Sequence, residues 1–491
     1  MRDVDPRTPV IVGVGQYKQQ LDDVREAREQ YELMVTALRR AGDNAGSPGL
    51  LSSIDRLLVI GGMWRYPDPG RLIADAVGAA DAQTFLTAMG GNMPQGCVSD
   101  AAERILAGAS EVVVICGGEA VYSKNKLRKL GQDLDRTGYD LPAAEPFGEN
   151  VQMASSHEQE RGFVMPSQIY PLFESAIRAA RGETFADHAA RVGALWEDFN
   201  RVAVSNPYAW VRTPMTAEEI VTPSPDNRLV GSPYTKSMNA NSFVDFGAAL
   251  IMCSAERAQA LGVPRDRWVF PHAGTDGHAS YLFSERDNFH TSPAIRRTGA
   301  ECLDLAGIGI DDVAHMDLYS CFPSVVQITM AELGIAPGRR VTTTGGLPFF
   351  GGPMNSYVLH AIASTVEAVR NDPGSLGFVH ANGGYATKHA CAVYGTEPPA
   401  RAFRRVDVQD EIDEYPTREV DERPEGRATV ESFTVMHDRQ GPQQALLTAL
   451  MPDGRRALAS SADPDLMAAM VEQEFVGAQC HLRPDGHVEV G

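Results

Sequence analysis

The run EVVVICGG, residues 111–118, is the feature of the chain that most restricts its fold. It is almost continuously apolar, which is typical of a strand covered on both faces. Apolar side chains in the segment before it recur at helical spacing, at Val98, Ala101, Ala102, Ile105 and Leu106. A helix that leads into a doubly covered strand is part of a βαβ unit, so a parallel sheet is predicted.

The same alternation of strands and helices continues on both sides of this run. VIVGVGQ (10–16) predicts a strand, the segment 23–41 predicts a helix that stops at Gly42, and IDRLLVIGG (54–62) predicts another strand. The pattern returns in four later segments: 238–262, 292–308, 315–334 and 351–370. Two βα halves are therefore expected, residues 1–120 plus 238–265 and residues 266–397. Residues 121–237, poorer in strands, are interpreted as a covering insertion.

The character of the chain changes after residue 397. Residues 398–426 are charged and contain proline, which is typical of an extended linker. Residues 427–491 contain short strand patterns, two turns with the sequence Asp-Gly and a helix start at Asp463. A small β-barrel or sandwich is predicted for this last segment.

Composition excludes several classes of protein. The 491 residues carry a formal charge of −20, which disfavours a nucleic-acid or anionic-membrane surface. No apolar run reaches about 18 residues, and acids at positions 3 and 5 do not fit a signal peptide, so a cytosolic protein without membrane insertion is predicted. Seven cysteines are scattered without ligand spacing, so reduced thiols and no metal site are expected.

Five motifs, in this order, resemble the boxes of the thiolase superfamily over residues 8–397. They are GGNMPQGCVSDAAERILAGASEVVVICGGE (90–119), NANSFVDFGAA (239–249), YSCF (319–322), GGLPFFGGP (345–353) and HANGG (380–384). The end of the chain resembles the additional C-terminal domain of thiolase-like proteins of type 1. The resemblance implies an α/β thiolase fold, layered αβαβα, with an inserted loop domain and a small OB-like β domain.

The catalytic positions of the family are substituted. By the resemblance, the nucleophilic cysteine falls on Gly91, the histidine of the GHP box on Gly352, the second cysteine on His380, and the oxyanion-box residue on Tyr319. Glycine cannot form an acyl-thioester, so standard thiolysis is disfavoured. Cys97 follows Gly91 by six residues, too deep in the helix for strong activation by the helix dipole, and is interpreted as a packing residue.

His380 and Tyr319 are the candidate catalytic residues. An imidazole transfers protons near neutral pH, and a phenol donates a hydrogen bond to an enolate. If the fold is that of thiolases, the two side chains should converge at one pocket. The alternatives are a structural histidine bonded to loop amides and a tyrosine that only packs at a strand end.

The resemblance also implies a binding site for a coenzyme A thioester. Gly91 and Gly384 correspond to positions whose amides face the thioester oxygen, with Asn92 and Gly352 beside them, and Ser242 corresponds to a serine against the pantetheine. The basic residues Lys124, Lys126 and Arg128 are candidates for the phosphates, although a solvated helix face is the alternative.

Three classes of function remain open after these observations. The first is an acyl-CoA-handling enzyme, nominally an acyltransferase, with altered chemistry. The second is a retro-aldol lyase acting on a β-hydroxyacyl-CoA, and the third is a non-catalytic acyl-CoA binding protein. The chain is expected to be a homodimer or, if the C-terminal domain covers the dimer surface, a monomer.

Overall fold

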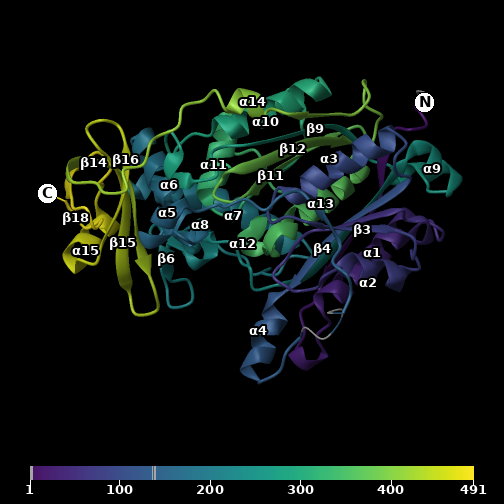
Figure 1. Ribbon diagram of the computed structural model, residues 1–491, viewed down its shortest axis with the longest axis horizontal. Helices are drawn as coiled ribbons and strands as arrows, with labels where there is room; N and C mark the ends of the chain where they lie inside the picture. Colours follow the sequence, from purple (N-terminus) through teal and green to yellow (C-terminus); the bar gives the residue numbers. More distant parts are fainter. Residues whose placement is uncertain (1–3, 135–136, 138–139, 491) are drawn as a thin grey trace.

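A computed structural model describes residues 4–134, 137 and 140–490 (Figure 1). Two mixed sheets form the body, and a third, separate sheet lies at the C-terminal end of the chain. No helix of the described residues is long and apolar enough to cross a membrane.

The first sheet has the strand order β1-β8-β4-β2-β3-β5. Its strands are β1 (Pro9–Lys18), β2 (Arg56–Val59), β3 (Gln83–Thr87), β4 (Val112–Ala120), β5 (Glu145–Phe147) and β8 (Asp245–Ser254). β4 is buried along its whole length and pairs in parallel with β2, as the apolar run predicted, but the sheet as a whole is mixed and not parallel throughout. β8 lies between β1 and β4 and is antiparallel to both.

The second sheet repeats this order with strands from the second half of the chain. Its order is β10-β11-β12-β9-β13, with β9 (Phe270–His278), β10 (His315–Leu318), β11 (Leu376–Gly383), β12 (Lys388–Gly395) and β13 (Arg404–Asp407). Thus β9, β12, β11 and β10 correspond to β1, β8, β4 and β2, as expected for two similar βα halves. β13 comes from the predicted linker and pairs in parallel with β9.

Helices form the other layers of the body. α3 (Met93–Leu106) and α13 (Tyr357–Asn371) contact strands of both sheets and make the middle layer. α1 (Gln30–Ala45) and α2 (Pro69–Val77) cover the first sheet from outside, and α10 (Pro293–Ala306) covers the second. α11 (Pro323–Glu332) packs beside α10, and short helices lie at α9 (Ala255–Ala260), α12 (Gly346–Phe349) and α14 (Gln409–Ile412).

The boundaries predicted for the first helix were wrong. The expected helix 23–41 begins only at Gln30, because the side chains and backbone amides of Glu29 and Glu32 cap each other there. Gly42 does not end the helix, which runs to Ala45 and stops at Gly46, a residue with a φ of 68°. Left-handed backbone of this kind suits glycine, whereas Gly42 lies inside the helix against Leu51.

The insertion between the halves is mainly helical. It contains α4 (Val121–Lys129), α5 (Ser156–Glu160), α6 (Pro166–Arg181), α7 (Phe185–Ser205) and α8 (Ala217–Val221), with three short strands, β5, β6 (Leu229–Gly231) and β7 (Tyr234–Thr235). α4 projects from the body, whereas α5 to α8 lie between the body and the C-terminal domain (Figure 1). The strands of the insertion join it to two sheets, because β5 pairs in the first sheet and β6 pairs with the C-terminal sheet.

The C-terminal domain is a small barrel with OB-like topology. Its elements are β14 (Gly426–His437), β15 (Pro442–Leu450), β16 (Arg456–Ser461), α15 (Pro464–Glu472), β17 (Gln479–Leu482) and β18 (Val488–Val490). The strand order β16-β15-β14-β17-β18 closes through a parallel bridge between Ser460 and His487. The Asp-Gly turns join β15 to β16 and β17 to β18, and Asp463 caps α15, as predicted.

Arg456 fastens this barrel to the second half of the body. Its side chain is fully buried and donates to the Ser284 carbonyl at 2.6 Å and the Asp287 carbonyl at 3.2 Å. The same guanidinium pairs with Glu431 of β14 at 2.6 Å. One cation thus satisfies acceptors of both parts, so its loss would leave several of them without a donor.

Arg456→Met is expected to lower the free energy of unfolding by about 3–5 kcal/mol, because it leaves a partly buried carboxylate unpaired. The neighbouring variant Arg455→Met is the matched control, since the ion pair of that arginine with Asp421 is at the surface and should add little to stability. Urea denaturation followed by circular dichroism measures both. Equal losses for the two variants would contradict the role of Arg456.

Candidate functional site

The loop before α3 meets the two loops at the ends of β10 and β11, and the contact is too close for any side chain at residue 91. A β-carbon built on Gly91 would lie 2.3 Å from the carbonyl oxygen of Asn382 and 2.7 Å from the hydroxyl of Tyr319. Both distances are far below van der Waals contact. The Tyr319 hydroxyl therefore occupies the place where a nucleophilic side chain at position 91 would stand.

Tyr319 follows β10 and is held from several sides. Its N–H donates to the carbonyl of His380 at 3.1 Å, and its ring meets the ring of Tyr357 edge-on at 5.6 Å. The side chain is only 8% exposed. Burial, with a smaller contribution from Cys321, raises the pKa of the Tyr319 phenol well above its usual range. The hydroxyl thus stays protonated and can act as a hydrogen-bond donor or acid.

His380 lies on β11, and its side chain points to the face of the second sheet opposite to that of Tyr319. Its Nε2 is 3.1 Å from Nδ1 of His389 and its Nδ1 is 3.5 Å from the hydroxyl of Thr329 on α11. Burial lowers the pKa of His380 to about 3, so the ring is neutral. Because His380 pairs with Leu318, the residue before Tyr319, strand alternation sends the two side chains to opposite faces. The structure does not bring the two candidate catalytic side chains together.

The glycine loop after β11 is fixed by Tyr170 of α6. The Tyr170 hydroxyl donates to the Gly384 carbonyl at 3.0 Å and accepts from the Asn382 side-chain amide and the Ala386 N–H at 3.1 and 2.9 Å. Gly384 has a φ of 71°, and a β-carbon there would lie 2.1 Å from the terminal methyl of Met153. Met153, a residue of the insertion, therefore covers Gly384, whose amide was expected to face a thioester.

The other predicted contacts of the thioester lie around the same loops. The Gly352 N–H donates to the carbonyl of Asn241, the residue before Ser242, at 2.8 Å. Ser242 is half-buried, and Phe243 after it is 58% exposed. The side-chain oxygen of Asn92 is buried and has no hydrogen-bond partner among the described residues. Gly352 thus lies against the residue that precedes Ser242, and their contact with a thioester stays a prediction.

The basic residues proposed for phosphate binding lie on α4. Lys126 and Arg128 are exposed, and the Lys126 ammonium lies over the ring of Tyr122 at 4.4 Å from its centre. Lys124, one turn before Arg128, is half-buried. The helix presents these cations on the part of the molecule that projects from the body (Figure 1).

The thiols of the chain are unsuited to nucleophilic attack. All seven cysteines are buried and unpaired. Burial raises the pKa of Cys97 far above its usual range, with Asp100 adding to the effect, and it raises the pKa of Cys321 in the YSCF box to about 12. Cys97 packs in the main core, which fits its interpretation as a helix packing residue. Within the described ranges, no group of three His, Cys, Asp or Glu side chains could hold a metal ion.

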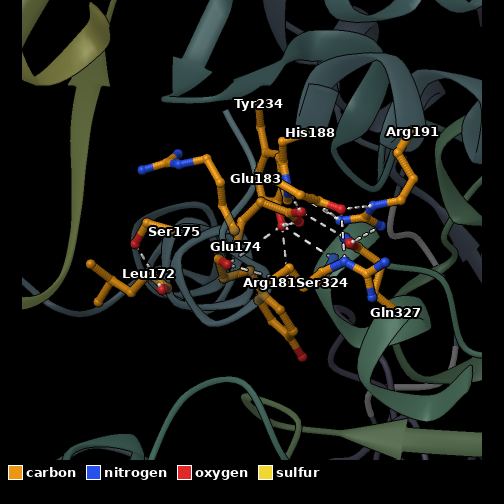
Figure 2. A network of polar contacts seen from close by, with 12 residues as sticks. Leu172, Glu174, Ser175, Arg181, Glu183, His188, Arg191, Tyr234, Ser324 and Gln327 are labelled. Atoms are coloured by element: carbon orange, nitrogen blue, oxygen red, sulfur yellow. Dashed lines mark hydrogen bonds and ion pairs between the residues drawn. The ribbon is translucent and has the colours of Figure 1, made fainter. Parts of the chain in front are cut away.

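A buried polar network joins the insertion to α11 (Figure 2). The carboxylate of Glu174 on α6 is fully buried and accepts from Nε2 of His188 at 2.6 Å, the Tyr234 hydroxyl at 2.5 Å and the Gln327 amide at 2.6 Å. Burial alone opposes ionisation, but these three hydrogen bonds lower the pKa of Glu174. The negative charge is therefore retained inside the protein at this joint.

This network positions the YSCF box. The Tyr234 hydroxyl lies 2.9 Å from the hydroxyl of Ser324, at the start of α11. Phe322 is stacked on Tyr170 at 4.5 Å and on Tyr234 at 5.6 Å. The aromatic contacts and the Glu174 hydrogen bonds hold the segment between Tyr319 and α11 from the insertion side.

Several residues that shape the site were not predicted from the sequence. Tyr170 and Glu174 lie in the insertion, which was interpreted only as a cover. Asn355 accepts from the Gly90 N–H at 3.1 Å, and Lys388 donates to the Met89 carbonyl at 2.7 Å. The only available signal was that Asn355 and Lys388 lie within a few residues of the GGP and HANGG motifs.

The buried histidines predict a loss of stability in mild acid. Burial lowers the pKa of His360 and of His380 to about 3, against about 6.5 in an unfolded chain. The stability that the neutral rings confer is complete above pH 6.5 and is lost as the pH falls towards 3, because the unfolded state binds the protons first. Each ring should lower the free energy of unfolding by about 2 kcal/mol between pH 7 and pH 5.

Urea denaturation at both pH values checks this loss. His360→Gln and His380→Gln should each weaken the pH dependence, whereas His290→Gln, at an exposed position, should leave it unchanged. A wild-type slope in both buried variants would contradict the assignment.

Comparisons with known proteins agree with this architecture. A family model, the additional C-terminal domain of thiolase-like protein type 1, matches residues 407–487. The crystal structure of a monomeric SCP2-thiolase-like protein type 1 from Mycobacterium smegmatis is 32% identical and covers 100% of both chains, with a TM-score of 0.85.

Two more distant proteins are also similar to this chain. An Ltp2–ChsH2(DUF35) aldolase superposes with a TM-score of 0.61 at 21% identity, over 80% of this chain and 98% of that chain. The benzoylsuccinyl-CoA thiolase subunit BbsB of Thauera aromatica is 25% identical over 192 residues, which are 35% of this chain. The chain spans about half the length of that curated relative, 48%. By its full-length likeness to the mycobacterial protein, the chain belongs to the SCP2-thiolase-like proteins of type 1 within the thiolase superfamily.

Proposed function

We propose that the protein binds a coenzyme A thioester and cleaves a β-hydroxyacyl-CoA by a retro-aldol reaction, without a covalent acyl-cysteine. The observation that carries this proposal is the hydroxyl of Tyr319, 2.7 Å from the place of a β-carbon at Gly91. Where a thiolase holds its nucleophile, this chain holds a protonated phenol. The available chemistry is therefore hydrogen-bond donation and proton transfer.

The reaction needs only groups of this kind. A base removes the proton of the β-hydroxyl, the bond between the α- and β-carbons breaks, and its electron pair passes to the thioester as an enolate. An aldehyde or ketone leaves, and a proton returns to the α-carbon. The Tyr319 hydroxyl and the Gly91 N–H are the donors for the enolate oxygen, which is the group where negative charge develops.

Standard thiolysis lacks its nucleophile here. Every cysteine of the chain is buried, and burial raises the pKa of Cys321, beside Tyr319, to about 12. A thiol with so high a pKa is a weak nucleophile at neutral pH. The likeness to an aldolase structure agrees with the proposal, although at 21% identity it concerns the fold alone.

Binding of an acyl-CoA without turnover is a second candidate function. It is favoured by the closure of the site, where the Met153 methyl covers Gly384 and Tyr319 is only 8% exposed. A substrate would have to displace Met153 to reach the Gly384 amide.

In either function, Ser242 and Gly352 are proposed to contact the thioester arm of the ligand. Lys124, Lys126 and Arg128 are proposed to bind its phosphates.

Tyr319→Phe is expected to lower kcat for β-hydroxyacyl-CoA cleavage by about 100-fold or more, because it removes a donor to the enolate. Chromatography of the acyl-CoA and carbonyl products measures the rate across a panel of chain lengths. The control Tyr394→Phe also removes a buried hydroxyl, one bonded to Gln95 at 2.7 Å, and should stay within about threefold of wild type. Tight binding of the panel by wild type with no turnover would favour the second function instead.

Gly91→Cys is expected not to create a thiolase, since its side chain would collide with Asn382 and Tyr319. It should lower the free energy of unfolding by about 1–3 kcal/mol, as overpacking does. Gly96→Ala, inside α3, is the control, because its methyl would meet only Asp276 at 3.4 Å and helix propensity favours alanine. Urea denaturation and an assay of acetoacetyl-CoA thiolysis test both variants. Acetyl-CoA formation by Gly91→Cys would contradict the steric argument.

A further inference from the structure

We propose that Lys388 is the base that removes the proton of the β-hydroxyl, so that its amine contacts the substrate. This inference rests on the proposed retro-aldol function and names the group that the function leaves open. Neither Tyr319, which is protonated, nor His380, which faces away from Gly91, can serve as that base. The geometry of the loop around Gly90 points to Lys388.

Lys388 begins β12 and lies directly opposite Gly383 of β11. Since His389 points towards α11 with His380, strand alternation turns Lys388 to the face where α3 begins. A β-carbon built on Gly90 would lie 2.9 Å from the Lys388 Nζ, and one built on Gly383 would lie 3.2 Å from its Cε. The amine therefore lies beside the glycines that the thioester is expected to approach.

A buried acceptor without a partner lies at the same place. The side-chain oxygen of Asn92 would be 2.5 Å from a β-carbon on Gly90 and 2.7 Å from one on Gly383. It has no hydrogen-bond partner within the part of the chain that is described. A buried carbonyl oxygen without a donor is costly, so a ligand group that donates there is favoured. The amide N–H groups of a coenzyme A thioester are donors of this kind, which leaves the single proton of the β-hydroxyl for Lys388.

The surroundings of Lys388 suit a base. Its Nζ donates to the Met89 carbonyl at 2.7 Å, and no carboxylate among the described residues forms an ion pair with it. Desolvation lowers its pKa, which increases the fraction of neutral amine at neutral pH. Lysines of this kind act as general bases when partly buried and unpaired.

The proton balance closes with Lys388 and Tyr319 alone. The neutral amine takes the proton of the β-hydroxyl and becomes an ammonium as the bond between the α- and β-carbons breaks. The electron pair of that bond moves into the enolate, whose oxygen accepts a hydrogen bond from Tyr319. After the aldehyde or ketone has left, the ammonium returns its proton to the α-carbon, and the amine is neutral again.

The test replaces the amine and then restores it. Lys388→Cys should lower kcat for β-hydroxyacyl-CoA cleavage at least about 100-fold, as expected for the loss of a general base. Treatment with 2-bromoethylamine converts that cysteine into a lysine analogue and should restore at least a tenth of the wild-type rate. The seven native cysteines are buried, so the treated wild-type protein is the control and should keep its activity.

A second variant separates catalysis from loop support. Lys388→Arg keeps a donor for the Met89 carbonyl but cannot accept a proton at neutral pH. It should bind the product acyl-CoA within about threefold of wild type and lose cleavage at least about 100-fold.

The outcomes distinguish the two proposals. If wild type cleaves the substrate and Lys388→Arg retains more than a third of the rate, Lys388 only supports the loop, and the inference is wrong while the proposed function stands. Failure of aminoethylation to restore Lys388→Cys also overturns it. If wild type cleaves no β-hydroxyacyl-CoA, both the function and the role of Lys388 are wrong.

Discussion

The arrangement of the site depends on one steric constraint, the contact between the loop before α3 and the loops that end β10 and β11. At Gly91 the carbonyl of Asn382 and the hydroxyl of Tyr319 fill the volume that a β-carbon would need. The two halves of the body meet here, so the absence of a side chain is what lets them meet this closely. A nucleophile at residue 91 and a tyrosine at residue 319 are mutually exclusive in this backbone. The chemistry of the chain follows from which of the two it holds.

The insertion maintains this contact from the opposite side of the second sheet. The Tyr170 hydroxyl fixes both ends of the glycine loop, and Glu174, one turn later on α6, ties the insertion to the start of α11 (Figure 2). A charged and fully satisfied carboxylate at such a joint resists displacement, because breaking one bond leaves a buried charge without its partner. The covering insertion is thus part of the site's scaffold. The insertion also contributes Met153, whose methyl covers Gly384 in the glycine loop.

Local patterns in the sequence were sufficient for the alternation of strands and helices, and the family resemblance supplied their layers, but neither gave the directions of the site's side chains. The apolar run of β4 predicted a doubly covered parallel strand, and the Asp-Gly turns predicted the C-terminal barrel, because both signals are local. The placement of His380 and Tyr319 depends on a one-residue offset between β10 and β11, and strand alternation turns such an offset into opposite faces. The end of α1 was misplaced for a related reason, since Gly42 and Gly46 differ in backbone conformation and not in composition. Tyr170 and Asn355 act across more than 200 residues of chain, so no spacing rule could have found them.

Burial gives the site its chemical character. The same desolvation keeps the Tyr319 phenol protonated, keeps the His380 ring neutral and keeps the Cys321 thiol from ionising. In each case the neutral form is favoured, so the only charge the site readily develops is the charge that its donors are placed to receive. Attack by a thiolate requires a stable anion before the reaction begins, whereas a retro-aldol cleavage creates its anion only as the carbon–carbon bond breaks. An environment that disfavours resident charge and offers donors beside Gly91 therefore suits the second kind of reaction better than the first.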